Sequence, residues 1–595
     1  PNEWQRGIII PLHKSGSVYD LDKYRGITLS SNVYKLFFSK TLEAPIIWYL
    51  ESNNILGDSQ GALSKDRRIE DHILSLQGIC TLSRSSKKPL YLAFLDLSKA
   101  FDRVWSDVLF PKLWQSGIQG KVWRLVKAIY KNVENKVLFG YIESTWFEQE
   151  YGVKQGCVLY PTLFSVLMND LVNMLNESGM SFESGRLLIN CLLFADDVVL
   201  IANSPSELQK LLQISHRFAT KWNLKFNHRK SKVLVVGKRL NPNSNWTLGE
   251  EKIDEVNEYK YLGYYINWSL KSNFHVNGYL KGKVQNMLNY MIRILGEHGA
   301  FNRVNFGEAL WKSVLLPSIT HACPVWMPLS LANVSMLDSW QYRAAKIVMS
   351  TKLNIPQSAL LLELGWEPIN AFINRQKVAY FKRLASLPDE RLCKRVLNEM
   401  LRRNETVWDY SREISDLTQS VGLDDFNKNH GYLTRDRLML DVTTKSSLDI
   451  YQHCRLEGGR QRYLNDTNNF MSCRLKLLAR TKHIQLKKYL FRMNISENDC
   501  FPICGTGEVE DLEHFLLKCQ PLEHIRSKFF DIFATLCPQD LDFMELSPSA
   551  KVLFLVGDIG FAFSHDIGTF YDFYGRSYLL ECFKARNDIL NRNVP

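Results

Sequence analysis

The sequence has no long hydrophobic run, no dense group of cysteines that would suggest a disulfide framework, and no tandem repeat. No apolar stretch approaches the ~18 residues that span a bilayer, and the N-terminal residues lack the basic-then-apolar order of a secretory signal. Twelve cysteines among 595 residues are too dilute for a disulfide scaffold. We therefore expect an intracellular protein without membrane spans. The chain begins with Pro1 rather than Met, which indicates a fragment of a longer reading frame.

The composition is that of a folded chain with a basic surface. Hydrophobic residues make up 45% and charged residues 23%, which excludes extensive disorder. A chain of 595 residues is too long to fold around a single hydrophobic core, so several domains are predicted. The net charge of +12 favours a polyanionic partner such as nucleic acid, although an ordinary basic surface explains it about equally well.

The pattern of hydrophobic residues changes near residue 275. Before it, strand-like runs alternate with amphipathic helices, as in a mixed α/β domain. Residues 90–95 predict a buried strand, and residues 187–194 and 198–201 predict two more strands joined by a tight turn. Ser204 is expected to cap the helix that follows. Beyond residue 275 the pattern predicts helices, for example over 280–295, 337–349 and 371–387.

Two acidic sites, each at the end of a predicted buried strand, indicate the chemistry. Asp196 and Asp197 lie side by side in the motif FADD, between the two strands of the predicted hairpin. Adjacent carboxylates repel each other, and a divalent cation would relieve that cost; an ordinary Asp-rich turn is the alternative. Asp96 closes the strand 90–95 and supplies a second strand-end carboxylate. Two such sites are what a two-metal phosphoryl-transfer centre needs.

These two segments resemble motifs A and C of reverse transcriptases, in the forms LDLSKAFD (95–102) and FADD (194–197) that are typical of the non-LTR, LINE-type retrotransposon branch. The chain is similar to the C-terminal part of an ORF2-like polyprotein of that branch. Six matches in all cover about residues 1 to 270. The four others resemble the fingers motif at 22–29, motif B at 152–161, motif D at 224–231 and motif E, the primer grip, at 259–263.

The resemblance implies an α+β fold of the right-hand polymerase type. Fingers and a palm with an antiparallel sheet are expected in residues 1–270, followed by a helical thumb in 271–350. A mainly helical, basic connector (351–495), a CCHC zinc knuckle (496–525) and a C-terminal tail of unknown role (526–595) would follow.

The implied activity is that of an RNA-directed DNA polymerase. Such a nucleotidyltransferase extends a DNA 3′-hydroxyl on an RNA template, and in this branch it does so by target-primed reverse transcription. The implied partners are an RNA template, a DNA primer or target, and dNTPs. A ribonucleoprotein in the nucleus and cytoplasm is the implied form. No nuclease motif is found in this chain, so a primer would have to be supplied.

By the same resemblance, Asp96, Asp196 and Asp197 would be catalytic and would bind two Mg²⁺ (or Mn²⁺) ions, with the Leu97 carbonyl completing one site. These metal ligands would come from motifs A and C together.

The resemblance also implies nucleotide contacts. Phe101 matches a steric gate against the ribose 2′-hydroxyl, with a core phenylalanine as the alternative. Gln155 and Gly156 would contact the incoming nucleotide, and Arg25 would hold its triphosphate. Lys230 would neutralise the departing pyrophosphate, although a solvated lysine explains this position almost as well.

Three departures from the family pattern leave alternatives open. Gly26 replaces a proline in the fingers motif, Tyr160 replaces a serine in motif B, and residues 60–68 lack the phenylalanine and first arginine of a Q-x-G-F-R motif. A catalytically weakened or domesticated RNA-binding protein is therefore one alternative. An RNA-dependent RNA polymerase is another, which Phe101 opposes.

A cluster near the C-terminus predicts one structural Zn²⁺. Cys500, Cys504, His514 and Cys519 offer three thiolates and one imidazole within about 20 residues, a set that suits tetrahedral zinc. Unrelated buried cysteines are the alternative, and His524 is a less supported substitute ligand. Basic residues before the cluster would either grip an RNA backbone or form a solvated helix face: Arg474, Lys476, Arg480, Lys482, Lys487, Lys488 and Arg492.

Overall fold

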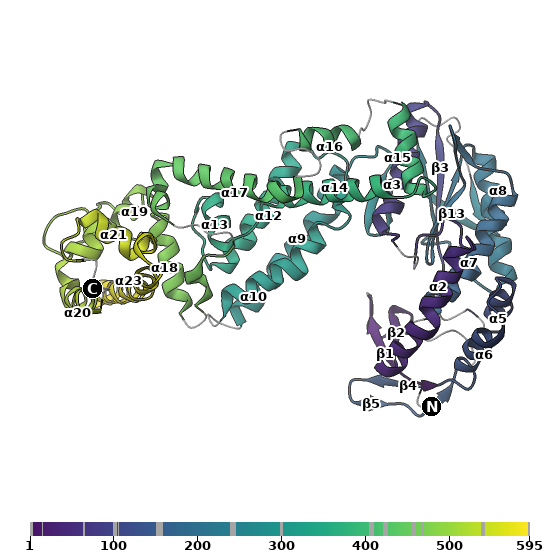
Figure 1. Ribbon diagram of the computed structural model, residues 1–595, viewed down its shortest axis with the longest axis horizontal. Coiled ribbons are helices and arrows are strands. Elements are labelled where there is room, and N and C mark those ends of the chain that lie inside the picture. The colour runs from purple at the N-terminus through teal and green to yellow at the C-terminus, as the bar shows by residue number, and fades with distance from the viewer. Residues whose placement is uncertain are drawn as a thin grey trace. The chain divides into compact units, whose positions relative to one another are not determined.

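The computed structural model divides the chain into two compact units (Figure 1). Unit 1 consists of Pro1–His275, Pro324–Pro328 and Tyr380–Asp416. Unit 2 consists of Val276–Cys323, Leu329–Ala379 and Leu417–Pro595. The structure describes residues 4–14, 16–62, 66–98, 104, 106–149, 159–237, 245–297, 302–403, 410–419, 426–454, 459–466, 469–536 and 542–592.

Unit 1 is built around a six-stranded sheet in which the central strands are antiparallel. β3 lies antiparallel to both β10 and β11, while β11 and β13 are parallel. β3 is buried at every position except its last, because its run of apolar residues is covered on both faces. The expected mixed α/β architecture is confirmed. The strand order is β12 (Trp246–Leu248), β13 (Glu251–Val256), β11 (Lys232–Val236), β3 (Leu90–Asp96), β10 (Asp197–Ala202) and β9 (Cys191–Phe194).

Helices cover both faces of this sheet. α7 (Tyr160–Glu177) and α8 (Pro205–Lys221) pack on the face that carries Tyr91 and Leu95, and together they form the main core of the unit. α3 (Ile69–Ser85) contacts β3 and β9 and lies on the other side of the sheet from α8 in Figure 1. The strands that carry the acidic residues are therefore held from two sides.

The helix α8 begins where the sequence predicts it. The Ser204 hydroxyl accepts a hydrogen bond from the backbone N–H of Glu207 at 3.2 Å, and Pro205 occupies the first helical position. The buried face recurs at helical spacing, so the amphipathic pattern decided which side meets the sheet. Its buried residues are Leu208, Leu211, Leu212, Ile214, Ser215, Phe218 and Ala219.

One predicted strand is wrong in its extent. Residues 187–194 form two strands rather than one, β8 (Leu187–Ile189) and β9. β8 pairs with β7 (Phe182–Ser184) in a separate hairpin, and only β9 joins the six-stranded sheet. The chain changes partner at Asn190, whose carbonyl accepts a hydrogen bond from the N–H of Ile201. A continuous apolar run does not reveal such a change of partner.

Unit 1 also contains a separate five-stranded sheet. β1 pairs antiparallel with β2 and parallel with β4, while β5 and β6 both pair with β4. α15 (Leu392–Arg403) packs against α3. The strands are β1 (Arg6–His13), β2 (Tyr24–Leu29), β4 (Glu134–Phe139), β5 (Ile142–Glu143) and β6 (Phe147–Glu148). The other elements are α1 (Asn32–Phe38), α2 (Ala44–Ser52), α5 (Ser106–Gln115), α6 (Gly120–Ile129), β14 (Glu258–Tyr261) and β15 (Tyr264–Asn267).

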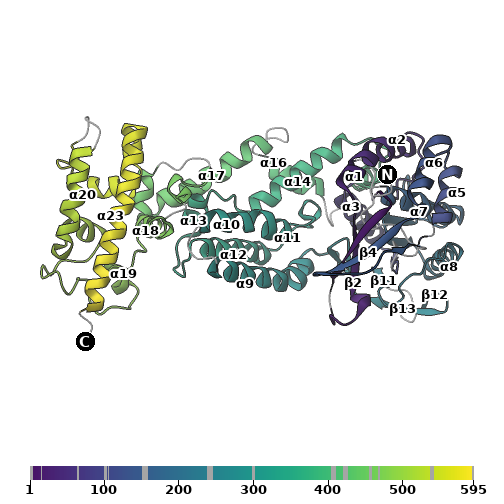
Figure 2. The same ribbon diagram turned by 90° about the horizontal axis from the view of Figure 1, so that it is seen from below.

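The elements that the structure describes in unit 2 are helices, as the sequence predicts, with one isolated β-bridge between Cys500 and Val509. Helices α20 and α23 lie side by side in both views (Figure 1 and Figure 2), and α23 also packs on α18 and α21. The main helices are α9 (Lys281–Glu297), α10 (Arg303–Leu310), α12 (Leu331–Val348), α13 (Gln357–Leu364), α17 (Phe426–Thr444), α18 (Phe470–Arg480), α19 (Lys487–Arg492), α20 (Glu523–Leu536), α21 (Pro548–Val556) and α23 (His565–Arg592). Among the described residues, no helix has both the length and the apolar character to cross a bilayer.

The two units do not follow the predicted segments one by one. Unit 1 takes in Tyr380–Asp416, which the sequence assigns to the helical connector. The predicted limits of thumb, connector, knuckle and tail stay predictions, since a compact unit is not the same as a functional subdomain.

Candidate functional site

Strands β3 and β10 bring the two acidic segments together. β3 ends at Asp96, β10 begins at Asp197, and the antiparallel register pairs these two residues directly. Cβ atoms of residues paired in this way lie about 4.5–5.5 Å apart, and their side chains project from the same face of the sheet. Two carboxylates that are far apart in the sequence therefore become neighbours.

Asp196 belongs to the turn between β9 and β10. Because Phe194 pairs with Asp197, the turn consists of Ala195 and Asp196 alone. Ala195 has a left-handed backbone with φ of 55°, a conformation that residues other than glycine rarely adopt. A two-residue turn of this kind places Asp196 beside Asp197 and keeps both at the end of the strands. The tight turn that the sequence predicts is confirmed.

Burial and like charge act on both carboxyl groups of the turn. Burial is the main cause at Asp197, with Asp196 and Asp96 adding to it, and together they raise its pKa to about 7. The pKa of Asp196 is also raised, by burial first and then by Asp96, although Arg25 and Lys230 act against this. Carboxylates held this closely are costly without a cation, and oxygen donors are those that Mg²⁺ prefers. The residues present therefore fit the predicted magnesium site.

The segment 224–231, which resembles motif D, leads into the neighbouring strand β11 and supports Asp96. The backbone N–H of Asn227 donates to the Asp96 carbonyl at 2.7 Å, and the Asp96 N–H donates to Ser231 Oγ at 3.2 Å. Lys230 Nζ lies 3.5 Å from Asp96 Oδ2, with its side chain 66% exposed. Nothing in the sequence indicated the hydrogen bond to Ser231, because Asp96 and Ser231 lie far apart in the chain and no local pattern relates them.

A tyrosine of motif E also belongs to this site. Tyr259 in β14 stacks on Phe94, with ring centroids 4.2 Å apart and planes at 16°. Phe94 lies two residues before Asp96, on the same face of β3. Burial, followed by the negative charges of Asp197 and Asp96, raises the pKa of the Tyr259 hydroxyl. The predicted primer-grip segment thus contacts the strand that carries the first carboxylate.

The structure places only part of the predicted nucleotide site. Arg25 lies exposed on β2, and its charge partly offsets the rise in the pKa of Asp196. Leu97 is buried and forms an isolated antiparallel bridge with Phe226. The remaining candidates, Phe101, Gln155 and Gly156, lie outside the described residues, as does most of motif B.

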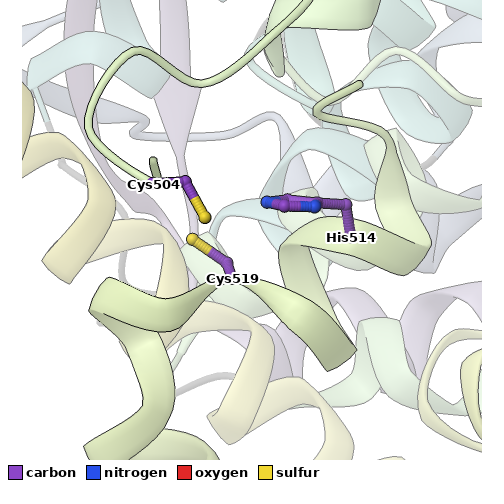
Figure 3. A group of neighbouring side chains, drawn as sticks. All are labelled: Cys504, His514 and Cys519. Atoms are coloured by element: carbon purple, nitrogen blue, oxygen red, sulfur yellow. The ribbon is translucent and has the colours of Figure 1, made fainter. Parts of the chain in front are cut away.

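Three of the four predicted zinc ligands lie together in unit 2 (Figure 3). The ligand atoms of Cys504, His514 and Cys519 all lie within 4.8 Å of one another, and all three residues are buried. His514 Nδ1 lies 3.1 Å from a carboxylate oxygen of Glu508, which leaves its buried Nε2 toward the two sulfur atoms. Two sulfurs and an imidazole nitrogen are a donor set of zinc sites, so these residues fit the ion.

The fourth predicted ligand lies apart from this group. Cys500 Sγ is 3.2 Å from the Gly507 carbonyl oxygen and 3.5 Å from the Asp499 carboxylate, and it is not among the atoms that converge. His524 is not among them either. The part of Cys500 in a zinc site therefore stays a prediction.

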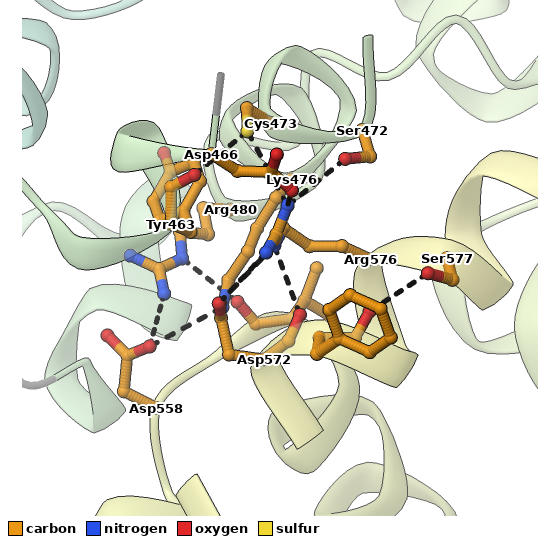
Figure 4. A network of polar contacts seen from close by, with 12 residues as sticks. Tyr463, Asp466, Ser472, Cys473, Lys476, Arg480, Asp558, Asp572, Arg576 and Ser577 are labelled. Atoms are coloured by element: carbon orange, nitrogen blue, oxygen red, sulfur yellow. Dashed lines mark hydrogen bonds and ion pairs between the residues drawn. The ribbon is translucent and has the colours of Figure 1, made fainter. Parts of the chain in front are cut away.

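Two of the basic residues before the cluster are buried, contrary to both interpretations of them. Lys476 and Arg480 are 1% and 0% exposed and are held by acidic partners in the interior of unit 2 (Figure 4). Neither RNA contact nor a solvated helix face is correct for these two positions. Their partners are Glu363 in α13, Asp558 and Asp572, residues far away in the sequence, so the local pattern of charges gave no sign of burial.

Comparison with known proteins agrees with this geometry. Residues 12–266 match the family model described as reverse transcriptase (RNA-dependent DNA polymerase). The chain is 25% identical over 396 residues to a probable RNA-directed DNA polymerase from transposon X-element of Drosophila melanogaster, covering 64% of this chain and 42% of that protein. It is 22% identical over 391 residues to the RNA-directed DNA polymerase from mobile element jockey of Drosophila funebris, with the same coverage.

A third relative covers a shorter region. The chain is 30% identical over 198 residues to the Pol polyprotein from the type-2 retrotransposable element R2DM of Drosophila melanogaster, covering 31% of this chain and 18% of that protein. Among solved structures, a telomerase from Candida tropicalis in complex with a telomeric RNA fragment shows a TM-score of 0.36 and 12% identity over 72% of this chain and 64% of that one.

The family match and the geometry concern the same residues. Asp96, Asp196 and Asp197 all lie inside the matched range, as do the segments that resemble the fingers motif, motif D and motif E. The chain spans about two fifths of the length of the first two relatives, at 42% of each. Residues 12–266 therefore match the reverse transcriptase (RNA-dependent DNA polymerase) family, and the first two relatives are RNA-directed DNA polymerases of mobile elements.

Proposed function

We propose that this chain is an RNA-directed DNA polymerase that extends a DNA 3′-hydroxyl on an RNA template. The observation that carries the proposal is the direct pairing of Asp96 with Asp197 across β3 and β10, with Asp196 in the adjoining turn. Two metal ions need more carboxylate ligands than a single acidic turn offers. The pairing of β3 with β10 brings the ligands of two segments together.

Each residue of the site would contribute in its own way. Asp96, Asp196 and Asp197, with the Leu97 carbonyl, would hold two Mg²⁺ ions. When bound, these ions would activate the primer 3′-hydroxyl and stabilise the leaving pyrophosphate. Lys230, 3.5 Å from Asp96, would hold a positive charge beside the departing phosphates.

The residues that would select the nucleotide are inferred from the resemblance to the family. Arg25 would bind the triphosphate, Gln155 and Gly156 would contact the incoming nucleotide, and Phe101 would exclude the ribose 2′-hydroxyl. RNA template, DNA primer and dNTPs as substrates are supported by relatives whose names state RNA-directed DNA polymerase activity. A ribonucleoprotein with its template RNA, in nucleus and cytoplasm, is the form proposed for the cell.

Primer extension with purified protein tests this function. A DNA primer annealed to an RNA template is expected to be extended with dNTPs and Mg²⁺, to lose extension in EDTA, and to recover it when Mg²⁺ is restored. Incorporation of rNTPs is expected to be lower by about 10²-fold or more, as for a site that rejects one hydroxyl by a steric clash. Equal use of rNTPs would instead indicate an RNA polymerase, and RNA binding without any extension would indicate an idle binding protein.

Lys230→Ala is expected to lower the extension rate by about 10- to 10²-fold without unfolding the protein. The exposed ion pair with Asp96 adds little to stability, about 0–1 kcal/mol, so the loss would come from the missing charge. Arg229→Ala is the matched control, since Arg229 is the neighbouring exposed cation. Single-turnover extension with both variants measures the effect. Equal rates for the two variants would show that Lys230 is merely solvated.

We further propose one structural Zn²⁺ at Cys504, His514 and Cys519, with Cys500 as the fourth ligand. Cys519→Ser is expected to abolish the release of about one equivalent of zinc on denaturation, and Cys500→Ser to weaken zinc binding. Cys454→Ser serves as control, because Cys454 lies in unit 2 away from the cluster. Zinc content is measured with a colorimetric chelator. Full zinc in Cys500→Ser would leave Cys500 outside the site.

A further inference from the structure

A histidine of α3 that none of the six motifs includes contacts the end of β9, directly before the turn that carries Asp196. His72 packs against Phe194 edge to face, with ring centroids 5.5 Å apart and planes at 77°. An aromatic pair of this geometry adds a favourable electrostatic contact to the apolar area that it buries. Phe194 is the last residue of β9, directly before the turn, so this contact acts at the base of the turn.

The backbone of Gly61 confines His72 from another side. Leu193 N–H donates to the Ser59 carbonyl and Gly61 N–H donates to the Leu193 carbonyl, each at 2.8 Å, so Gln60 forms an isolated parallel bridge with Leu193 of β9. A Cβ atom on Gly61 would lie 1.7 Å from His72 Nε2. His72 itself is 5% exposed. The ring is therefore held between a glycine backbone and the Phe194 ring.

The start of α3 is anchored within the same unit. One carboxylate oxygen of Asp71 accepts from the Tyr380 hydroxyl at 2.8 Å and from Arg383 Nη1 at 2.7 Å. The other accepts from Arg383 Nη2 at 2.9 Å and from the Arg68 backbone N–H at 3.0 Å. A bidentate arginine pair of this kind fixes orientation as well as distance. The helix turn that presents His72 therefore has a defined position relative to β9.

We propose that His72 is a positioning residue that holds the turn between β9 and β10, and with it Asp196 and Asp197, where both can share metal ions with Asp96. The inference rests on the proposed polymerase function. The left-handed backbone of Ala195 explains why support is needed, because a strained turn persists only when its surroundings hold it. The affinity of a site for its metal falls when the residues that orient the ligands are removed.

The contact works through shape rather than charge. Burial lowers the pKa of His72 to about 4, so the ring is neutral near pH 7. Its Nδ1 is buried and makes no hydrogen bond to any residue that the structure describes. A phenylalanine, which also packs edge to face, is therefore expected to replace this histidine, whereas alanine is not.

The test compares His72→Ala and His72→Phe with the wild type and with Thr81→Ala. Thr81 is a matched control because it is buried on the same helix and its hydroxyl donates only to its own helix at Gln77. The first measurement is Mn²⁺ affinity by electron paramagnetic resonance, which needs no activity. The second is the Mg²⁺ concentration that gives half-maximal primer extension, and circular dichroism confirms folding. If His72→Ala does not fold, His72→Leu replaces it, since leucine fills space without the edge-to-face geometry.

His72→Ala is expected to weaken Mn²⁺ binding and to raise the half-saturating Mg²⁺ concentration by about 10-fold each, while His72→Phe and Thr81→Ala stay within about 3-fold. A merely structural role would lower thermal stability and leave both metal readouts unchanged, which would overturn the proposal. An equal metal defect in Thr81→Ala would also overturn it. A wild type that binds Mn²⁺ but extends no primer would refute the polymerase function alone, and the Mn²⁺ comparison would still decide the role of His72.

Discussion

Asp197→Asn is expected to lower the rate of nucleotide incorporation by at least about 10³-fold while the protein stays folded. Asparagine keeps the size of the side chain but removes the charge that two divalent cations need. Because Asp197 pairs directly with Asp96, the loss leaves one member of the cross-strand pair without its counterpart. The measurement is single-nucleotide extension of a DNA primer on an RNA template, at saturating dNTP and Mg²⁺.

The same substitution is expected to stabilise the metal-free fold, by about 1 kcal/mol. Burial and the neighbouring carboxylates Asp196 and Asp96 oppose a charge at this position, so a neutral side chain relieves the repulsion. Thermal unfolding in EDTA should therefore show a higher midpoint for the variant. Added Mg²⁺ should raise the midpoint of the wild type more than that of the variant, since only a bound ion stabilises the folded state.

Asp254→Asn is the control for both measurements. Asp254 lies on β13 of the same sheet, but its side chain is 76% exposed and pairs with Lys232 at 2.6 Å. The change removes the same charge from an exposed position on a strand that pairs with neither β3 nor β10, and activity should stay within about 2-fold of wild type. If Asp197→Asn kept more than a tenth of wild-type activity, the two-metal mechanism would have to be abandoned.

Arg480→Met is expected to destabilise unit 2 by about 3–5 kcal/mol, the largest stability effect predicted here. Arg480 is fully buried, and its guanidinium donates to Asp558 at 2.5 Å (Figure 4). It also donates to Glu363 at 3.1 Å and to the Val556 carbonyl at 2.9 Å. Methionine fills a similar volume but leaves the buried Glu363 carboxylate without this cation. An uncompensated buried charge costs far more than the pair itself contributes.

The network that Arg480 belongs to joins α18 to α23. Lys476 pairs with Asp572 at 2.7 Å and Arg576 with Asp466 at 2.8 Å, both largely shielded from water. Loss of Arg480 should therefore loosen the C-terminal helices, and protease should cut the variant there at lower denaturant concentrations than wild type. Asp558, Asp572 and Arg576, which lie in the predicted tail for which the sequence indicated no role, thus take part in the interior of unit 2.

Lys482→Met provides the comparison for Arg480→Met. Lys482 follows the same helix and pairs with Asp449 at 2.8 Å, but both side chains are substantially exposed at 40% and 54%. Because water screens the charges, such a pair contributes only about 0–1 kcal/mol to the free energy of unfolding. Urea unfolding followed by circular dichroism measures both variants. Similar midpoints for the two would mean that burial of the Arg480 network adds nothing to stability.

Local sequence patterns were enough for several parts of this molecule. The apolar run of β3, the capped start of α8 at Ser204 and the tight turn at Asp196 could be predicted because each depends on residues close together in the chain. The helical character of the second half could be predicted for the same reason. The split of residues 187–194 into two strands could not, since it depends on which strand each half pairs with.

The sequence by itself determined which residues carry carboxylates, thiolates and imidazole, and in what order the family motifs follow one another. Only the tertiary structure decided that Asp96 faces Asp197, that Cys504, His514 and Cys519 converge without Cys500, and that Arg480 lies in the interior. The physical reason is that strand register, ligand convergence and burial arise from contacts between residues distant in the chain. A local pattern of polarity and charge indicates which secondary structure a segment favours. These contacts depend instead on which distant segments pack against it in the folded chain.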